Sequence, residues 1–209
     1  MKNTLYLFLM SVLILFTACK NETKQEGPTK EEIKIEESNI NINPSHAQIG
    51  LNIAFTTKAQ LGKNLIGTMK EKGVLEALQF CNIKAIPLTD SMATVHQAII
   101  KRVSDKTRNP NNKANEVELK NIEYFKSVLA KNEEIKPIVE TSNDSVNFYY
   151  PIVTNAMCLQ CHGNPEKDLN PELLTSLSNL YPNDEAVGYS ENQVRGIWSI
   201  QFKNNKIDE

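Results

Sequence analysis

The chain has 209 residues, of which 40% are hydrophobic and 23% are charged, and its formal net charge is −2. This is the composition of an ordinary soluble globule, and the length allows one domain plus extensions. No basic run is dense enough to indicate a nucleic-acid partner, so we expect none.

The N-terminus predicts an exported lipoprotein. An apolar run at 5–16 is too short to span a bilayer but suits the core of a signal peptide. It ends in Phe16-Thr17-Ala18-Cys19, which resembles a bacterial lipobox, in which Cys19 is acylated and becomes the first residue. We therefore expect a signal peptide over 1–18 and a lipid anchor in a membrane, at the periplasmic face or the cell surface. The alternative is a conventional signal peptide cut near Ala18, which would leave Cys19 as a free thiol.

The following segment, 19–44, is rich in Lys, Glu, Asn and Thr and has almost no large apolar residues. Such a composition is typical of a flexible, charged tether. The pattern changes near Ser45, so we expect the folded domain to take in 45–209.

Two helices are predicted at the start of this domain. Apolar residues recur at helical spacing, so a helix capped at or near Ser45 should run to about Lys72, where Gly73 breaks it. A second helix should follow and stop at Pro87. Within it, Leu78 and Cys81 are three residues apart and should share the buried face.

A strand and a third helix come next. Residues 95–104 are expected to form the strand, and Met92 and His96 belong either to it or to a preceding turn. The Asn-Pro and Asn-Asn steps in 107–112 mark a polar loop with tight turns. Apolar periodicity then predicts a helix over 115–131.

The C-terminal part combines a β-hairpin with a further helix and strand. Apolar runs at 138–141 and 146–153 flank a short polar loop, and Pro151 places its part of the second run at an edge or a bulge. A short helix is expected at 171–180 and a last strand at 194–202. The whole pattern predicts an α+β fold with a mainly antiparallel sheet flanked by helices, the first of them long.

The hairpin leads directly into Cys158-Leu159-Gln160-Cys161-His162-Gly163. Two thiols three positions apart, with an imidazole directly after the second, have the spacing for covalent attachment of one haem c. Cys158 and Cys161 would form thioethers with the two vinyl groups, and His162 would be the proximal iron ligand. The alternatives are a redox-active thiol pair or half of a zinc site, although no second close pair of ligands is present.

One thiol, Cys81, is left without a partner for an intramolecular disulfide, which in an exported protein calls for an explanation. On spacing alone it is either a small buried apolar residue or a ligand. Two arginines, Arg102 and Arg108, are candidate contacts for haem propionates, because a guanidinium pairs with a carboxylate through two hydrogen bonds. The alternative for both is an ordinary surface contact or a contact that stabilises a loop.

The order of these motifs resembles a family of bacterial PAS-like c-type haem domains, long described as a domain of unknown function. The resemblance covers about 45–202 and depends on several short motifs: Gly73, Cys81, Arg102-Val103-Ser104, Arg108-Asn109-Pro110-Asn111-Asn112, Cys158-Leu159-Gln160-Cys161-His162-Gly163, Ala186-Val187-Gly188-Tyr189 and Arg195-Gly196. Where the family often has Arg-Thr-Ser, this chain has Val103 in the middle position.

The resemblance implies a PAS-like fold and, at the position of Cys81, the distal iron ligand of the family's structural type case. Met69, Met92, Met157 and His96 are competing sixth ligands, and an open five-coordinate iron is a further alternative.

This ligand set favours a redox or small-gas sensor that signals to a protein partner. A low-potential electron carrier outside the cytoplasm is the alternative. We do not expect an enzyme, and a haem peroxidase is the weakest alternative, since only His96 would serve as its acid and base.

Overall fold

The computed structural model describes residues 44–204. The predicted signal peptide, Cys19 and nearly all of the predicted tether therefore lie outside the described residues, as do 205–209. Among the helices that are described, none combines the length and apolarity needed to cross a membrane.

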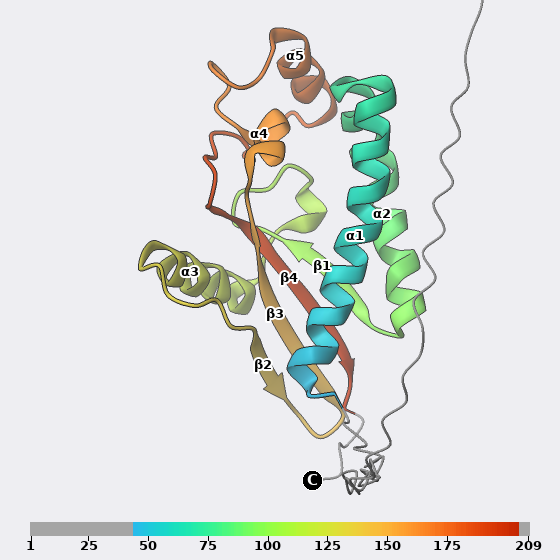
Figure 1. Ribbon diagram of the computed structural model, residues 1–209, viewed down its shortest axis with the longest axis vertical. Coiled ribbons are helices and arrows are strands. Elements are labelled where there is room, and N and C mark those ends of the chain that lie inside the picture. Colours follow the sequence, from blue (N-terminus) through green and yellow to red (C-terminus); the bar gives the residue numbers. More distant parts are fainter. Residues whose placement is uncertain (1–43, 205–209) are drawn as a thin grey trace, which may run out of the picture. The chain divides into compact units, whose positions relative to one another are not determined.

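The described chain forms helices and strands in the order that Figure 1 shows. The helices are α1 (His46–Lys72), α2 (Val74–His96), α3 (Glu116–Ala130), α4 (Ala156–His162) and α5 (Pro171–Leu180), and a single 3₁₀ turn covers Pro110–Asn112. The strands are β1 (Ile99–Val103), β2 (Ile138–Thr141), β3 (Ser145–Val153) and β4 (Val194–Lys203).

The four strands form one sheet in the order β1-β4-β3-β2, and every neighbouring pair is antiparallel. The last strand in sequence, β4, therefore lies between β1 and β3. The expected α+β fold, a PAS-like antiparallel sheet flanked by helices with a long N-terminal helix, is confirmed.

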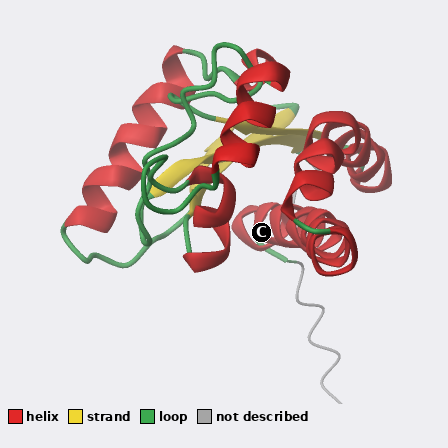
Figure 2. Cartoon of the chain, turned by 90° about the horizontal axis from the view of Figure 1, so that it is seen from above, coloured by secondary structure: helices red, strands yellow, loops and turns green. Residues whose placement is uncertain are grey.

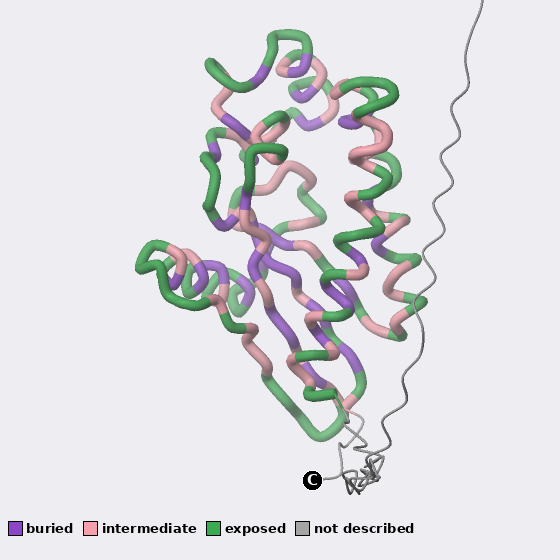
Figure 3. The backbone as a smooth tube through the Cα atoms, viewed as in Figure 1, coloured by how far each residue is buried: buried purple, intermediate pink, exposed green. Residues whose placement is uncertain are grey.

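Helices cover both faces of this sheet, as Figure 2 shows from above. Successive side chains of a strand point to opposite faces, which divides the core in two. On one face, Phe148 and Trp198 pack with Ile53 of α1. On the other face, Tyr149 and Ile197 pack with α3. In Figure 3 the buried residues follow the inner strands, while the outer sides of the helices are exposed.

The contact between α1 and the sheet is close because Gly50 has no side chain. A Cβ atom at this position would lie 2.1 Å from Cδ2 and 2.3 Å from Cγ of Phe148. The helix backbone therefore rests directly on the aromatic ring of β3. This contact fixes the height of α1 above the sheet.

The predicted start and end of α1 are confirmed. Ser45 forms a capping box with Gln48, in which each side chain accepts a hydrogen bond from the backbone N–H of the other residue. Gly73 ends the helix with a φ of 87°, a left-handed value that favours glycine. The same glycine begins α2, so the two helices are joined without a longer loop.

The prediction that Pro87 stops the second helix is wrong, because α2 continues through Pro87 to His96. Proline removes the hydrogen bond to the carbonyl group four residues earlier, which belongs to Ile83. Ile83 is 58% exposed, so water can reach this part of the helix. Met92 and His96 consequently belong to α2, and β1 starts only at Ile99.

The other elements agree with the predictions within a few residues. The helix expected at 115–131 is α3, with a capping box between Asn115 and Glu118. The hairpin and α5 lie where they were expected. Pro151 pairs with β4 on one side. On its other side β2 no longer pairs with β3 beyond Tyr149, so Pro151 lies at a local edge of the sheet, as predicted.

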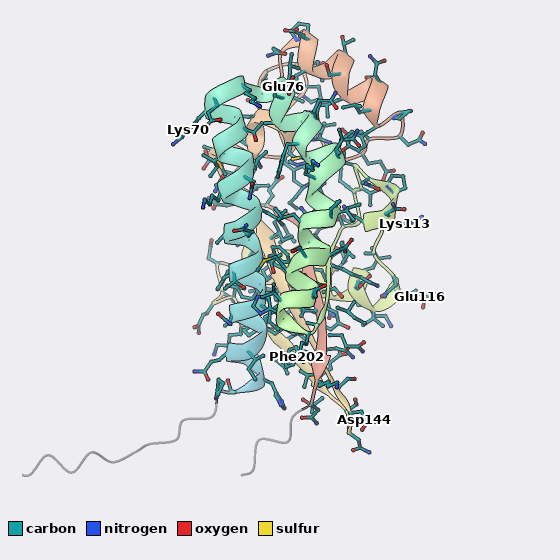
Figure 4. All side chains as sticks on the ribbon, turned by 90° about the vertical axis from the view of Figure 1, so that its right-hand side faces the viewer. Lys70, Glu76, Lys113, Glu116, Asp144 and Phe202 are labelled. Atoms are coloured by element: carbon teal, nitrogen blue, oxygen red, sulfur yellow. The ribbon has the colours of Figure 1, made fainter. Side chains whose placement is uncertain are left out.

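A third cluster lies where α5 packs against α2. Leu78 belongs to one buried cluster with Leu173, Leu177 and Tyr181, and Cys161 packs against this cluster. Figure 4 shows α1 and α2 side by side, with Glu76 at the end near α5 and Phe202 far from that end. The motif helix α4 also lies at the α5 end, beside α2 (Figure 1).

Candidate functional site

The attachment motif forms the short helix α4, a helix that the sequence analysis did not predict. Asn155 caps it, because its Oδ1 accepts hydrogen bonds from the backbone N–H groups of Met157 at 3.0 Å and Cys158 at 3.3 Å. One turn of helix places residues three apart on the same side. The local sequence thus presents Cys158 and Cys161 together.

The helix ends at Gly163, where the backbone is crowded. A Cβ atom there would lie 2.5 Å from Oδ2 of Asp168 and 2.6 Å from the Leu159 carbonyl oxygen. The same Asp168 oxygen accepts a hydrogen bond from the N–H of Asn164 at 2.7 Å. A glycine directly after His162 is therefore required by the packing of this turn.

The predicted site residues come together around one cavity of about 270 Å³, close to the lower end of the range of roughly 300–1,000 Å³ found for ligand pockets. Its lining includes all six residues predicted for haem attachment, iron ligation by His and Cys, and propionate contact: Cys81, Arg102, Arg108, Cys158, Cys161 and His162. These residues come from α2, β1, the loop after β1, and α4. The cavity is thus formed by parts of the chain that are distant in sequence.

His162 is held through one of its two ring nitrogens. Nδ1 lies 2.7 Å from the carbonyl oxygen of Ala186. A carbonyl can only accept, so Nδ1 must carry the hydrogen and donate it. Arg195 Nε lies 3.4 Å from the same nitrogen. Because Nδ1 carries a hydrogen in this tautomer, it cannot accept a hydrogen bond from Arg195. Nε2 is left as the nitrogen with a free lone pair for a metal ion.

The surroundings of His162 keep its ring neutral. Burial, and then the positive charges of Arg108 and Arg195, hold the pKa of His162 well below its usual value. Neutral imidazole is the form that binds metals. The segment after Ala186 adds backbone support, because Tyr189 N–H donates to the His162 carbonyl at 2.9 Å.

The three thiols within 44–204 form no disulfide with one another, and they differ in their environment. Burial raises the pKa of Cys161 to about 11, against the positive charge of Arg108. Burial also raises the pKa of Cys81, against the charges of Arg102 and Arg108. Cys81 shares one face of α2 with Leu78, as predicted, and both line the cavity.

The two predicted arginines differ in what they contact. Arg108 donates from Nε to Asp184 Oδ2 at 2.9 Å and from Nη2 to the Cys161 carbonyl at 2.6 Å. Arg102 has no hydrogen bond or ion pair from its guanidinium to any other residue of 44–204, although it lines the cavity. Burial lowers the pKa of Arg102, which means that its charge is poorly solvated. Arg102 is therefore the arginine that is available for an anionic ligand.

A third arginine, Arg195, also lines the cavity. Its Nη1 donates to Ser104 Oγ at 2.8 Å and to the Lys106 carbonyl at 3.0 Å, and its guanidinium lies over the ring of Tyr189. Arg195 was noticed in the sequence only as part of the resemblance, without a role. Its position in β4, opposite β1, could not be inferred without the strand order.

The competing ligands separate into two pairs. Met69 and Met157 line the cavity. Met92 packs into the core between α1 and the sheet. His96 Nε2 lies 2.8 Å from the Thr56 hydroxyl. Neither of these last two residues borders the cavity.

The chain was also compared with known proteins. A family model described as Tll0287-like matches residues 20–202, so the chain belongs to the Tll0287-like family, as the resemblance predicted. A crystal structure of the cyanobacterial haem protein Tll0287 matches with a TM-score of 0.52 and 20% identity, covering 76% of this chain and 96% of that chain. At this identity the match shows the fold. A search of curated proteins found no match.

Proposed function

We propose that this member of the Tll0287-like family is an exported, lipid-anchored protein that binds one haem c and acts as a redox or small-gas sensor. The observation that carries the proposal is that Cys158, Cys161, His162 and Cys81 line a single cavity. Similarity to a cyanobacterial haem protein supports haem binding at the level of the family. When bound, haem supplies one-electron chemistry and a site for small gases.

The motif helix would provide the attachment and the proximal ligand. Cys158 and Cys161 would form the two thioethers. His162 would bind iron through Nε2, because Nδ1 donates to Ala186. The neutral state of the ring supports this role, since no proton has to be lost before the metal binds.

Cys81 would be the distal ligand. It lies on α2, so it reaches the cavity from a different element than His162 does. A metal-bound thiol is deprotonated. Burial raises the pKa of Cys81, and the charges of Arg102 and Arg108 offset part of that effect. A thiolate ligand stabilises ferric iron more than methionine does and is readily lost on protonation, which suits a switch better than a shuttle.

The charges around the cavity also fit haem. Arg102, Arg108 and Arg195 line it, and the carboxylate paired with them is Asp184 beside Arg108. This arrangement leaves positive charge for two anionic groups, and a haem carries two propionates. Arg102 would contact a propionate, since it has no other partner within 44–204. For Arg108 the contacts with Asp184 and Cys161 favour the alternative to a propionate contact, which is that Arg108 stabilises its loop.

The export signal, the acyl chain on Cys19 and the extracytoplasmic location are part of the proposal and depend on the sequence alone. A lipid with more than one acyl chain would anchor the protein stably. The sensor would then act on an unidentified protein partner at the membrane.

The decisive experiment compares the wild type with Cys81→Ala and with Met69→Leu. All three proteins are produced with a working haem-attachment system, and their ferric spectra and midpoint potentials are measured. We expect Cys81→Ala to lose the thiolate absorption and to have a higher midpoint potential. Met69→Leu removes the sulfur atom that α1, and not α2, brings to the cavity, and it should leave both quantities unchanged. Identical spectra for wild type and Cys81→Ala would mean that Cys81 only packs.

The same proteins separate a sensor from an electron carrier. In a gas sensor, carbon monoxide added to the ferrous protein should displace Cys81. Retention of the sixth ligand under carbon monoxide would favour the low-potential electron carrier. Peroxide turnover with a donor dye would favour the enzyme alternative. Acid-acetone treatment that strips all haem from the chain would contradict covalent attachment.

A further inference from the structure

A chain of hydrogen bonds joins Arg108 to the proximal histidine through Asp184. Arg108 Nε donates to Asp184 Oδ2 at 2.9 Å, and the Ala186 N–H donates to Asp184 Oδ1 at 2.8 Å. The carbonyl group of that same Ala186 accepts from His162 Nδ1 at 2.7 Å. Both carboxylate oxygens of Asp184 are therefore used, one by a side chain and one by the backbone that holds His162.

Arg108 also bonds to the motif directly. Its Nη2 donates to the Cys161 carbonyl at 2.6 Å and approaches the Ala186 carbonyl at 3.4 Å. The side chains of Arg108 and Asp184 are only 10% and 9% exposed, so water competes little for these bonds. The Glu185 N–H donates to the Thr107 carbonyl at 2.9 Å, which ties the two loops together a second time.

We propose that Arg108 and Asp184 are a positioning pair that fixes the Ala186 carbonyl against His162 Nδ1 and thereby sets the donor strength of the iron-binding nitrogen. This inference rests on the proposed function. The hydrogen bond from Nδ1 to the carbonyl increases electron density on the ring, which makes Nε2 a stronger ligand and favours ferric iron. The carbonyl can hold this position only while the 184–186 segment is fixed.

Asp184→Asn tests the pair with almost no change in shape. The amide has one acceptor oxygen instead of two, so it can serve Arg108 or the Ala186 N–H but not both. The holoprotein is studied in the Cys81→Ala background, so that the ferrous iron has no distal ligand. In its Raman spectrum we expect Asp184→Asn to lower the iron–histidine stretching frequency. We also expect a higher midpoint potential than in the parent protein.

The matched control is Asp168→Asn. It removes a carboxylate of the same type, also close to the motif, whose Oδ2 accepts a backbone hydrogen bond from Asn164. Asp168 contributes no hydrogen bond to Ala186, to Arg108 or to the His162 ring, so the iron–histidine frequency should not change. Equal shifts in both variants would indicate a general effect of charge and would overturn the proposal, as would no shift in Asp184→Asn.

A second measurement covers the case in which Asp184→Asn attaches no haem. Arg108→Lys keeps a positive charge near Asp184 but cannot bond Asp184 and Cys161 together in the same geometry. In this variant the exchange of the His162 Nδ1 hydrogen with solvent, followed by NMR, should become about tenfold faster. The reason is the loss of the charge-assisted hydrogen bond between residue 108 and Asp184, which holds the Ala186 carbonyl in place. An unchanged exchange rate would overturn the proposal. If the wild type carries no covalent haem, the proposed function fails instead.

Discussion

Two alanine substitutions in the same helix should have opposite effects on stability. Gly67 lies in α1, and nothing outside its own helix backbone is within 4 Å of the point that an added methyl carbon would occupy. Gly67→Ala should therefore stabilise the protein by about 1 kcal/mol through helix propensity. Gly50→Ala gains the same propensity but places a methyl group on the ring of Phe148. Three ring atoms would lie at 2.1, 2.3 and 2.6 Å from the new carbon.

The size of the difference follows from those distances. Carbon atoms attract each other best at about 3.5–4.0 Å, so the ring or the whole helix has to move by more than about 1 Å. Overpacking of this kind typically costs about 1–3 kcal/mol. The propensity gain cancels between the two variants, so we expect Gly50→Ala to be less stable than Gly67→Ala by about 3 kcal/mol.

The assay is urea denaturation of each variant, followed by circular dichroism. Phe148→Leu should lower the free energy of unfolding less in the Gly50→Ala protein than in the wild type, because the smaller side chain makes room for the methyl group. We expect the two losses to differ by about 1 kcal/mol or more. Equal stabilities of the two alanine variants would refute the close contact between α1 and the sheet. Additive effects of Gly50→Ala and Phe148→Leu would place the strain elsewhere.

Two further predictions concern the motif and the loop after β1. Gly163→Ala should lower the fraction of chains that carry covalent haem, measured by mass spectrometry, because the methyl group would lie 2.6 Å from a backbone oxygen; an unchanged fraction would contradict this. For Asp105, burial would raise the pKa, but the hydrogen bond and the charge of Lys126 outweigh burial and lower it. The stabilisation by this pair should therefore be present above about pH 4 and be lost as the pH falls through the lowered pKa. Acid unfolding of Asp105→Asn should lack that part of the pH dependence, and identical acid curves would show that the pair contributes nothing.

The sequence predicted most elements because their signals are local. Ser45 and Gly73 delimit α1 through the chemistry of helix ends, and the hairpin follows from alternation around a polar loop. Pro87 was misleading because the cost of a proline inside a helix depends on what surrounds the freed carbonyl group. That environment is a property of the packed helix, so the sequence does not contain it in readable form.

The site was predictable to the extent that its residues have distinctive chemistry. The two motif cysteines and His162 were recognisable from spacing, and Cys81 from the resemblance; the structure brings all of them to one cavity. Asp184 could not be recognised, since a single acidic residue in a loop has no pattern. The role of Ala186 depends on a backbone carbonyl, which any residue type possesses.

The central place of β4 sets an order on folding. Within the described chain, β1 has β4 as its only partner in the sheet, and β3 forms its longest pairing with the same strand. A growing chain that has not yet reached residue 194 therefore cannot close its sheet, however many earlier helices it contains. The thiols at 158 and 161 emerge before this point, on a chain that is still open. The topology thus leaves the core around these two thiols incomplete until the last strand has formed.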